Sequence, residues 1–409
     1  MRSAGPACFA VACAALAHAD TIRAIDFSAH GYLDCRLVAR ADERSFADGG
    51  LGKTRFGGGG TDATCVQAGI ATTAIFAPSL LAQAELQYQT TDHATVSVLE
   101  AYLRYRPVST TPLRWSVRAG AFFPPISLEN EAIGWTSPWT LTSSAINSWI
   151  GEEFRAIGAE GRVEWRGDAA TIEGIAALVR SNDPAGELLA ARGWSLSDMV
   201  SGLGSRVREP DAYATDNGAP VPLRFNPFLE NDGRLGWYAG ATWDARGVGK
   251  LAILRYDNRA DRASRSNGVS PVLSWKTDFW SLGAQTRVAD IVLLGQAMTG
   301  STAIAPSPFF ATHTDFRAAY VLAAWDHGAW RPALRVDAFS TDQLPRTLDS
   351  RVREHGSAVT FALNWRPREW LRLTGEALRV YSRRNQREQE GLTASQADTQ
   401  LQLGVRVIF

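Results

Sequence analysis

Lysine, cysteine and net charge are what this sequence has least of. Only three of its 42 basic residues are lysines (Lys53, Lys250 and Lys276), so the remaining 39 are arginines. The basic residues are matched by 42 acidic ones, and a chain without net positive charge lacks the electrostatic footprint of a nucleic-acid-binding protein. The arginine bias favours short-range pairing with carboxylates or anions, because the guanidinium group is a rigid fork of donors.

Long apolar runs are also missing from most of the chain. The exception is the start, where Arg2 precedes a short apolar run and an Ala-His-Ala cleavage pattern. Residues 1–19 are therefore predicted to be a cleavable signal peptide for export, and residues 20–409 a single mature domain. Within the mature chain no stretch of 18 uninterrupted apolar residues occurs, which leaves no helical route across a membrane.

Removal of the signal peptide would leave two cysteines, Cys35 and Cys65. An oxidising compartment permits a disulfide between them. Two separate thiols are an equal alternative, because the sequence does not give the distance between their Cα atoms. No Cys-x-x-Cys pair is present, so neither a zinc site nor a redox dithiol is indicated. No metal or cofactor is predicted.

A two-residue alternation of apolar and polar side chains recurs along the mature chain. Val359, Phe361 and Leu363, for example, alternate with small or polar residues. Segments of about ten residues with one apolar and one polar face are typical of transmembrane barrel strands. Sixteen strands are predicted at 23–38, 65–76, 79–89, 95–106, 113–122, 153–165, 169–180, 235–246, 249–258, 275–288, 291–300, 313–326, 330–340, 356–366, 370–382 and 398–409.

The connections between these segments alternate in length. Those after even-numbered segments are short, and those after odd-numbered segments are mostly long, with residues 90–94 as the one break in the pattern. Short periplasmic turns and long external loops are the pattern of outer-membrane barrels. The predicted fold is an all-β, transmembrane, antiparallel up-and-down β-barrel of about 16 strands, with 14 to 18 as the range because segment boundaries carry errors of about two to four residues.

Aromatic residues and the end of the chain distinguish this fold from a soluble all-β protein. Trp and Tyr fall near predicted strand ends, as interfacial girdles require: Trp115, Trp165, Trp243, Trp325, Trp330, Trp365, Trp370 and Tyr381. The run from Asp398 to Phe409 alternates apolar and polar residues and ends on an aromatic one. This ending resembles the last strand of Gram-negative outer-membrane porins. The stretch from Arg118 to Glu129 is loosely similar to the phosphate-selective type of these porins.

The resemblance implies a place in the outer-membrane lipid, reached by export through the periplasm, with Phe409 as a signal to the barrel-assembly machinery. It also implies a porin-like channel for passive diffusion of small polar or ionic solutes. The excess of arginine over lysine favours anions among these solutes. A structural barrel or adhesin without a channel is the alternative from another class.

Charged side chains collect on the face opposite the apolar one. An arginine on the lipid face would cost about 2–4 kcal/mol at the membrane midplane, so these side chains are predicted to face the lumen. Rings of charge in a water-filled lumen select among ions, whereas an ion-pair lattice filling a plugged interior is the competing interpretation. The candidate pore-lining residues are Arg114, Arg118, Glu160, Arg162, Glu164, Arg335, Asp337, Arg372 and Glu376.

The predicted loop 123–152 is too apolar for a solvated loop, with Trp139 and Trp149 among its residues. Exposed apolar surface of this kind marks a contact with something that buries it. Three options are open: a constriction inside the lumen, contact with a neighbouring subunit as in trimeric porins, or a cap over the barrel mouth. The candidate constriction residues are Glu129, Glu131, Trp135 and Glu152.

Enzymatic and nucleotide-binding functions find little support. His313 and His355 lie near outer strand ends among polar residues, but no nucleophile motif accompanies them. The segment 47–54 fits a relaxed phosphate-loop pattern, yet Arg-Phe and four glycines follow it where that loop requires a helix. We therefore predict no enzymatic activity, with an outer-membrane hydrolase as the least favoured alternative.

Overall fold

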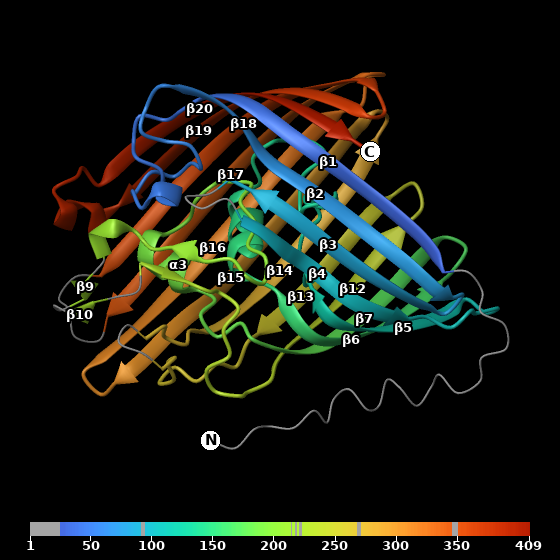
Figure 1. Cartoon of the computed structure of the whole chain (residues 1–409), viewed down its shortest axis with the longest axis horizontal. Helices are drawn as coiled ribbons and strands as arrows, with labels where there is room; N and C mark the ends of the chain where they lie inside the picture. The colour runs from blue at the N-terminus through green and yellow to red at the C-terminus, as the bar shows by residue number, and fades with distance from the viewer. Residues whose placement is uncertain are drawn as a thin grey trace.

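The computed structural model describes residues 25–90, 95–213, 215–216, 219–220, 223–267, 271–345 and 351–409. Sixteen strands form one closed barrel in which each strand pairs with its neighbours along the chain and β20 pairs with β1. Figure 1 shows these strands running obliquely around a single barrel. The predicted antiparallel up-and-down barrel is therefore confirmed, and so is the strand count of sixteen.

The barrel strands are β1 (Asp26–Ala39), β2 (Thr61–Ala77), β3 (Leu80–Gln89), β4 (Thr95–Tyr105), β5 (Leu113–Phe122), β6 (Ala156–Arg166), β7 (Ala170–Arg180), β12 (Gly236–Ala245), β13 (Gly249–Asp257), β14 (Lys276–Val288), β15 (Ile291–Ser307), β16 (Phe310–Trp325), β17 (Trp330–Pro345), β18 (Val352–Arg368), β19 (Leu371–Arg384) and β20 (Ser395–Ile408).

Smaller elements lie in the long loops. Two short ladders pair β8 (Val207–Arg208) with β11 (Arg224–Phe225) and β9 (Thr215–Asp216) with β10 (Ala219–Pro220). The helical elements are α2 (Ala145–Glu153), α3 (Glu187–Arg192), η1 (Phe46–Asp48), η2 (Asp211–Tyr213) and η3 (Asn385–Glu390). No helix in the described part of the chain is long and apolar enough to cross a membrane.

The alternation seen in the sequence becomes the two faces of the barrel wall. On β16, Val321 is exposed on the outside while Tyr320 and Leu322 are buried on the inside. Tryptophans are exposed at the strand ends next to the short turns, where an indole ring can meet a membrane–water interface: Trp115, Trp165, Trp243, Trp325, Trp330, Trp365 and Trp370. The outer surface therefore has an apolar wall with an aromatic girdle at one end.

Several strands extend further than the sequence predicts. β15 continues to Ser307 and β17 to Pro345, each beyond its predicted end at the external side. Beyond its predicted end β17 carries Thr341, Asp342 and Gln343, which are polar on both faces, and the added part of β15 mixes Ser and Thr with Ala, Ile and Pro. The alternation that marks a strand therefore fades while the backbone pairing continues. β6 begins at Ala156, later than predicted, because α2 occupies the chain up to Glu153.

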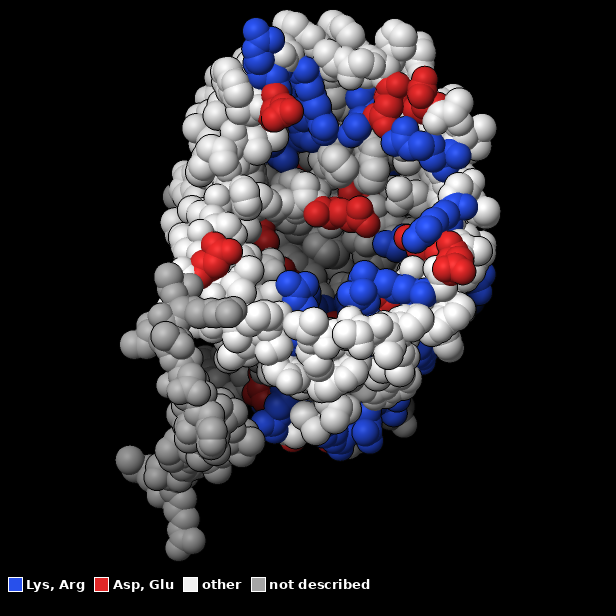
Figure 2. Space-filling model, turned by 90° about the vertical axis from the view of Figure 1, so that its right-hand side faces the viewer, with Lys and Arg blue, Asp and Glu red and all other residues white. Residues whose placement is uncertain are grey.

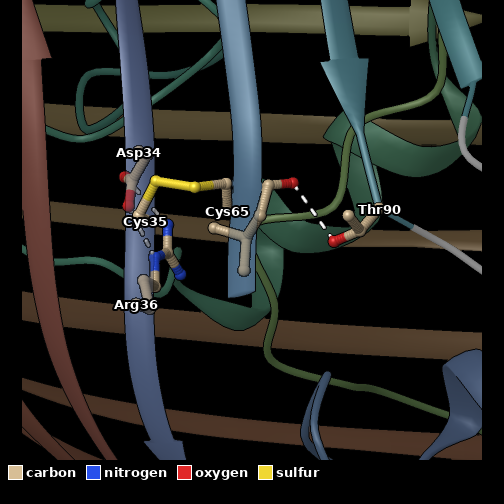
Figure 3. Close-up of a disulfide and its surroundings, with 6 residues drawn as sticks. Asp34, Cys35, Arg36, Cys65 and Thr90 are labelled. Atoms are coloured by element: carbon tan, nitrogen blue, oxygen red, sulfur yellow. Dashed lines mark hydrogen bonds and ion pairs between the residues drawn. A yellow bond between two sulfur atoms is a disulfide. The ribbon is translucent and has the colours of Figure 1, made fainter. Parts of the chain in front are cut away.

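The barrel closes next to a disulfide. The backbone of Phe409 exchanges two hydrogen bonds with Gly31 of β1, at 2.7 and 3.0 Å, so the last residue extends the seam between β1 and β20. Cys35 and Cys65 are cross-strand partners on β1 and β2 and are joined by a disulfide (Figure 3). The predicted signal peptide, residues 1–19, lies outside the described residues, as do residues 91–94 of the predicted short turn.

Candidate pore and constriction

The apolar loop after β5 folds into the barrel, which is the first of its three predicted options. Every residue of α2 is buried, and the helix begins at Ser144, whose side chain accepts a hydrogen bond from the backbone N–H of Asn147. Trp149 of α2 packs edge-on against Phe316 of β16, with ring centroids 4.9 Å apart. The inner wall of the barrel thus buries the apolar side chains that a solvated loop would expose.

One arginine of the wall fixes this loop. Arg335 on β17 forms ion pairs with Glu129 of the loop at 2.5 Å and with Asp337 of its own strand at 2.8 Å. It also donates hydrogen bonds to the carbonyl oxygens of Thr142 at 2.7 Å and Ser143 at 3.0 Å. A guanidinium group has five N–H donors and can make several such contacts at once. Arg335 therefore connects the wall to Glu129 and to the two residues Thr142 and Ser143 just before α2.

The start of α2 meets the same two carboxylates. Asp337 accepts a hydrogen bond from the backbone N–H of Ala145 at 3.1 Å, and Glu129 accepts one from the backbone N–H of Ser144 at 3.0 Å. Free N–H groups and the helix dipole make a helix start favourable for negative charge. The predicted constriction residue Glu129 and the predicted pore residues Arg335 and Asp337 therefore form one buried unit.

Two further predicted pore residues contact the loop backbone. Glu376 on β19 accepts hydrogen bonds from the backbone N–H groups of Leu141 at 2.5 Å and Thr142 at 3.1 Å. Arg372 donates one to the carbonyl oxygen of Ser137 at 3.2 Å. Both side chains face inward and are buried. Here the charged side chains of the wall bind the backbone of the loop.

The short-turn half of the lumen is more open. At its inner end Arg118 pairs with Glu160 at 2.9 Å, and the hydroxyl of Tyr238 donates a hydrogen bond to the same carboxylate at 2.6 Å; these three side chains are buried. Arg162 bridges Glu160 at 3.4 Å and Glu173 at 3.1 Å, and its side chain is 30% exposed. Figure 2 shows this end of the barrel as a hollowed mouth with basic and acidic side chains around it. Water therefore reaches a charged inner wall.

The remaining pore candidates also lie at this mouth. Glu164 pairs with Arg166 of its own strand. Arg114 is the register partner of Glu164 and is exposed. Arg104, which the sequence analysis did not select, is the register partner of Arg118, and its guanidinium donates to the hydroxyl of Tyr102 at 3.5 Å.

The other constriction candidates have different partners from those expected. Glu131 lies 3.8 Å from Lys250 of the wall and is 51% exposed. Glu152 pairs with Arg192, which belongs to the second long loop and not to the wall. Trp135 stacks on Phe123 with ring centroids 4.0 Å apart. Only Glu129 of the three carboxylates faces an arginine of the wall.

The second long loop, after β7, also enters the barrel. Asp198 forms ion pairs with Arg36 of β1 at 2.6 Å and with Arg55 at 3.0 Å, and the indole N–H of Trp194 donates to the carbonyl of Ser340 at 3.1 Å. The helix α3 ends at Arg192 because Gly193, with a φ of 72°, caps it and turns the chain toward the wall.

Sequence reasoning missed a buried ion pair that links the first long loop to the wall. Lys53 lies 2.5 Å from Glu354 of β18, and both side chains are almost fully buried. The ammonium also donates to the carbonyl of Arg192 at 2.9 Å. The scarcity of lysine was the only signal in the sequence for a special role of Lys53, and it does not indicate that Glu354 is its partner.

Three buried carboxyl groups occupy the two inward loops. Burial raises the pKa of Glu153 to about 8 and that of Glu209 to about 7. It also raises the pKa of Glu187 well above its usual range, with the neighbouring Glu209 adding to the effect. Glu153 accepts a hydrogen bond from the backbone N–H of Leu188 at 3.1 Å. Burial therefore favours the neutral form of each of these carboxyl groups.

Asp183, Glu230 and Asp232 are the one group of carboxylates with metal-ligand spacing within the described ranges. Their oxygens already accept backbone N–H groups, including that of Gly233 at 2.7 Å to Glu230 and that of Asn231 at 2.5 Å to Asp183.

A closed barrel of sixteen strands with an apolar outer wall, an aromatic girdle and charged inner faces defines an outer-membrane β-barrel protein. No protein-family model matches the sequence, and no curated protein matches it. Solved structures share its fold. The outer membrane channel DcaP of Acinetobacter baumannii is 11% identical, with a TM-score of 0.53 over 94% of this chain and 97% of that one.

Two further solved structures share the fold of this chain. The anion-selective porin from Comamonas acidovorans is 10% identical, with a TM-score of 0.50 over 94% of this chain and 100% of its own. The in-vitro folded trimer form of OmpT, an outer membrane protein of Vibrio cholerae, is 11% identical, with a TM-score of 0.50 over 95% of this chain and 100% of that one. The particular fold of this protein is thus that of the outer-membrane porins.

Proposed function

We propose that the protein is a passive outer-membrane channel for small polar or ionic solutes, with anions favoured, and that it has no enzymatic activity. The observation that carries the proposal is the solvent-exposed charged wall below the loops. Barrels of 16 to 18 strands are wide enough for an aqueous channel, and partly exposed side chains such as Arg162, at 30%, and Lys250, at 31%, line the short-turn half. The inward loops then form the constriction.

In the short-turn half of the lumen the carboxylates are paired more completely than the arginines, and this difference supports the preference for anions. The carboxylates Glu160, Glu164 and Glu173 each have an arginine partner. Arg104 has no carboxylate partner among the described residues and faces Arg118 in register. An uncompensated guanidinium in a narrow aqueous passage attracts anions and repels cations.

Planar-bilayer recording of the purified barrel tests the channel. We expect stepwise currents and a reversal potential in a salt gradient that has the sign of anion preference. A folded barrel that gives no steps would contradict the proposal and support the alternative, a structural or adhesive barrel. The two buried loops that cross the lumen are the observation that favours this alternative.

The biogenesis and assembly of the protein are part of the same proposal. Residues 1–19 direct export in a Gram-negative cell, and Phe409 at the barrel seam is the signal to the assembly machinery. The porin fold, which OmpT of Vibrio cholerae adopts in a trimer form, supports a homotrimer. Light scattering in detergent measures the subunit number, and deletion of Phe409 is expected to lower the yield of folded barrel in the membrane.

A further inference from the structure

A row of alanines crosses the outer wall of the barrel. Ala297, Ala319 and Ala338 are successive register partners on β15, β16 and β17, and all three face outward. Larger side chains border the row, with Val321 and Val336 paired on one side of it. The result is a groove of about 640 Å³ in the lipid-facing wall. We call it the alanine groove, defined by Ala297, Ala319 and Ala338.

An arginine stands at the external edge of the alanine groove. Arg317 lines the groove together with Trp280 and Leu282, and it is the register partner of Thr299 and Ser340, neither of which carries charge. Within the described part of the chain Arg317 has no hydrogen bond or ion pair. Asp315, two residues away on the same face of β16, contacts His313, and its register partner Asp342 pairs with Arg351. A lipid-facing guanidinium that pairs with neither carboxylate is stabilised by an anion from outside the protein.

The height of Arg317 fits the boundary of the apolar belt. It stands eight residues from the girdle residue Trp325 on the same strand. With about 3.4 Å per residue and a strand tilt of about 40°, Arg317 is roughly 20 Å above the girdle, and the belt is about 25 Å tall. His355 and Arg379, ten residues from Trp365 and nine from Trp370, reach a similar height. These side chains lie where external-leaflet head groups begin.

We propose that the alanine groove is a binding site for a phosphate-bearing lipid of the external leaflet. The phosphate pairs with Arg317, because a guanidinium group forms paired hydrogen bonds with phosphate oxygens. One acyl chain lies across the alanines, where small side chains let it approach the wall closely. The proposal goes beyond the channel function and holds whether or not the barrel conducts.

Native mass spectrometry of the detergent-purified barrel tests the site with two lipids that share the same acyl chains. Phosphatidylglycerol carries the phosphate and diacylglycerol lacks it. We expect the protein to retain phosphatidylglycerol about tenfold more tightly, and Arg317→Gln to abolish the difference. Ala319→Leu, which fills the groove, is expected to weaken the binding of both lipids. Arg368→Gln, at an exposed periplasmic turn, is the matched control and leaves retention unchanged.

Three results would overturn the site. Equal retention of phosphatidylglycerol by the original protein and Arg317→Gln removes the role of the guanidinium. Displacement by inorganic phosphate at equal concentration shows that Arg317 binds free phosphate and not a lipid. Disulfide-linked dimers of Ala319→Cys in the membrane show that a second copy of the chain occupies the groove. Heat-modifiable migration on gels verifies beforehand that each variant is folded.

Discussion

Arg335 of β17 and Glu129 of the loop after β5 lie 2.5 Å apart in the lumen, and neither side chain is exposed to solvent. They are 206 residues apart in the sequence. The same guanidinium also binds Asp337 and two loop carbonyls, so Arg335 connects the loop to the wall together with the contacts of Glu376 and Arg372.

Arg335→Met is expected to destabilise the barrel strongly. It leaves Glu129 and Asp337 as buried carboxylates without their partner, a change that costs about 3–5 kcal/mol. Urea unfolding in detergent measures the loss. Arg331→Met on the same strand is the control, because its pair with Asp326 is partly exposed, at 23% for each side chain, and pairs of that kind contribute about 0–1 kcal/mol. Equal losses in the two variants would contradict the role given to Arg335.

The packing of the inward loops is expected to loosen as pH rises. The pKa of Glu153 is raised to about 8 in the folded protein and is about 4.3 in an unfolded chain. The folded state therefore binds the proton more tightly, so its contribution to stability is complete below about pH 4.3 and is lost as the pH rises to about 8. Glu209 and Glu187 act in the same direction.

Hydrogen exchange of the 182–201 segment at pH 5.5 and 8.5 measures this loosening, with rates corrected for the intrinsic effect of pH. We expect faster opening at pH 8.5, and Glu153→Gln is expected to weaken the dependence because its amide does not ionise. Glu164→Gln, at the open mouth, is the control. An unchanged pH profile in Glu153→Gln would show that this carboxyl group is not the cause.

Loss of the disulfide is expected to lower stability while leaving the barrel able to fold. Cys35 and Cys65 are separated by 30 residues, and a cross-link of that span restricts the unfolded chain by about 3–4 kcal/mol. The double variant Cys35→Ser/Cys65→Ser should unfold at lower urea concentration. A reducing agent should shift the original protein to the same midpoint and leave the variant unaffected. A shift in the variant would indicate that the reductant acts elsewhere.

Ion selectivity is expected to respond to Arg104. Arg104→Glu replaces a cation that has no carboxylate partner among the described residues with an anion beside Arg118, so the reversal potential in a salt gradient should move toward cation preference. Arg368→Glu makes the same charge change at an exposed turn and should have a smaller effect. Equal shifts in both variants would mean that overall surface charge, and not the lumen, sets the selectivity.

The sequence by itself determined the barrel wall. A period of two is a local property, so the alternation around Val359, Phe361 and Leu363 could be read without knowing any partner strand, and the tryptophans at the short turns marked one edge of the belt. The inward positions of Arg335 and Glu376 followed from the same alternation. Where polar residues occupy both faces, as at Thr341, Asp342 and Gln343 of β17, the local signal ended before the strand did.

Only the tertiary structure decided what fills the barrel. The apolar loop could be buried by the lumen, by a second subunit or over the mouth, and the choice depended on contacts between distant residues. Arg335 meets Glu129, and Lys53 meets Glu354. A buried charge in the sequence indicates that a partner of opposite charge is needed, but it does not indicate which residue that partner is. The closed barrel wall brings residues far apart in the sequence close together in space, and this proximity decides which charges pair.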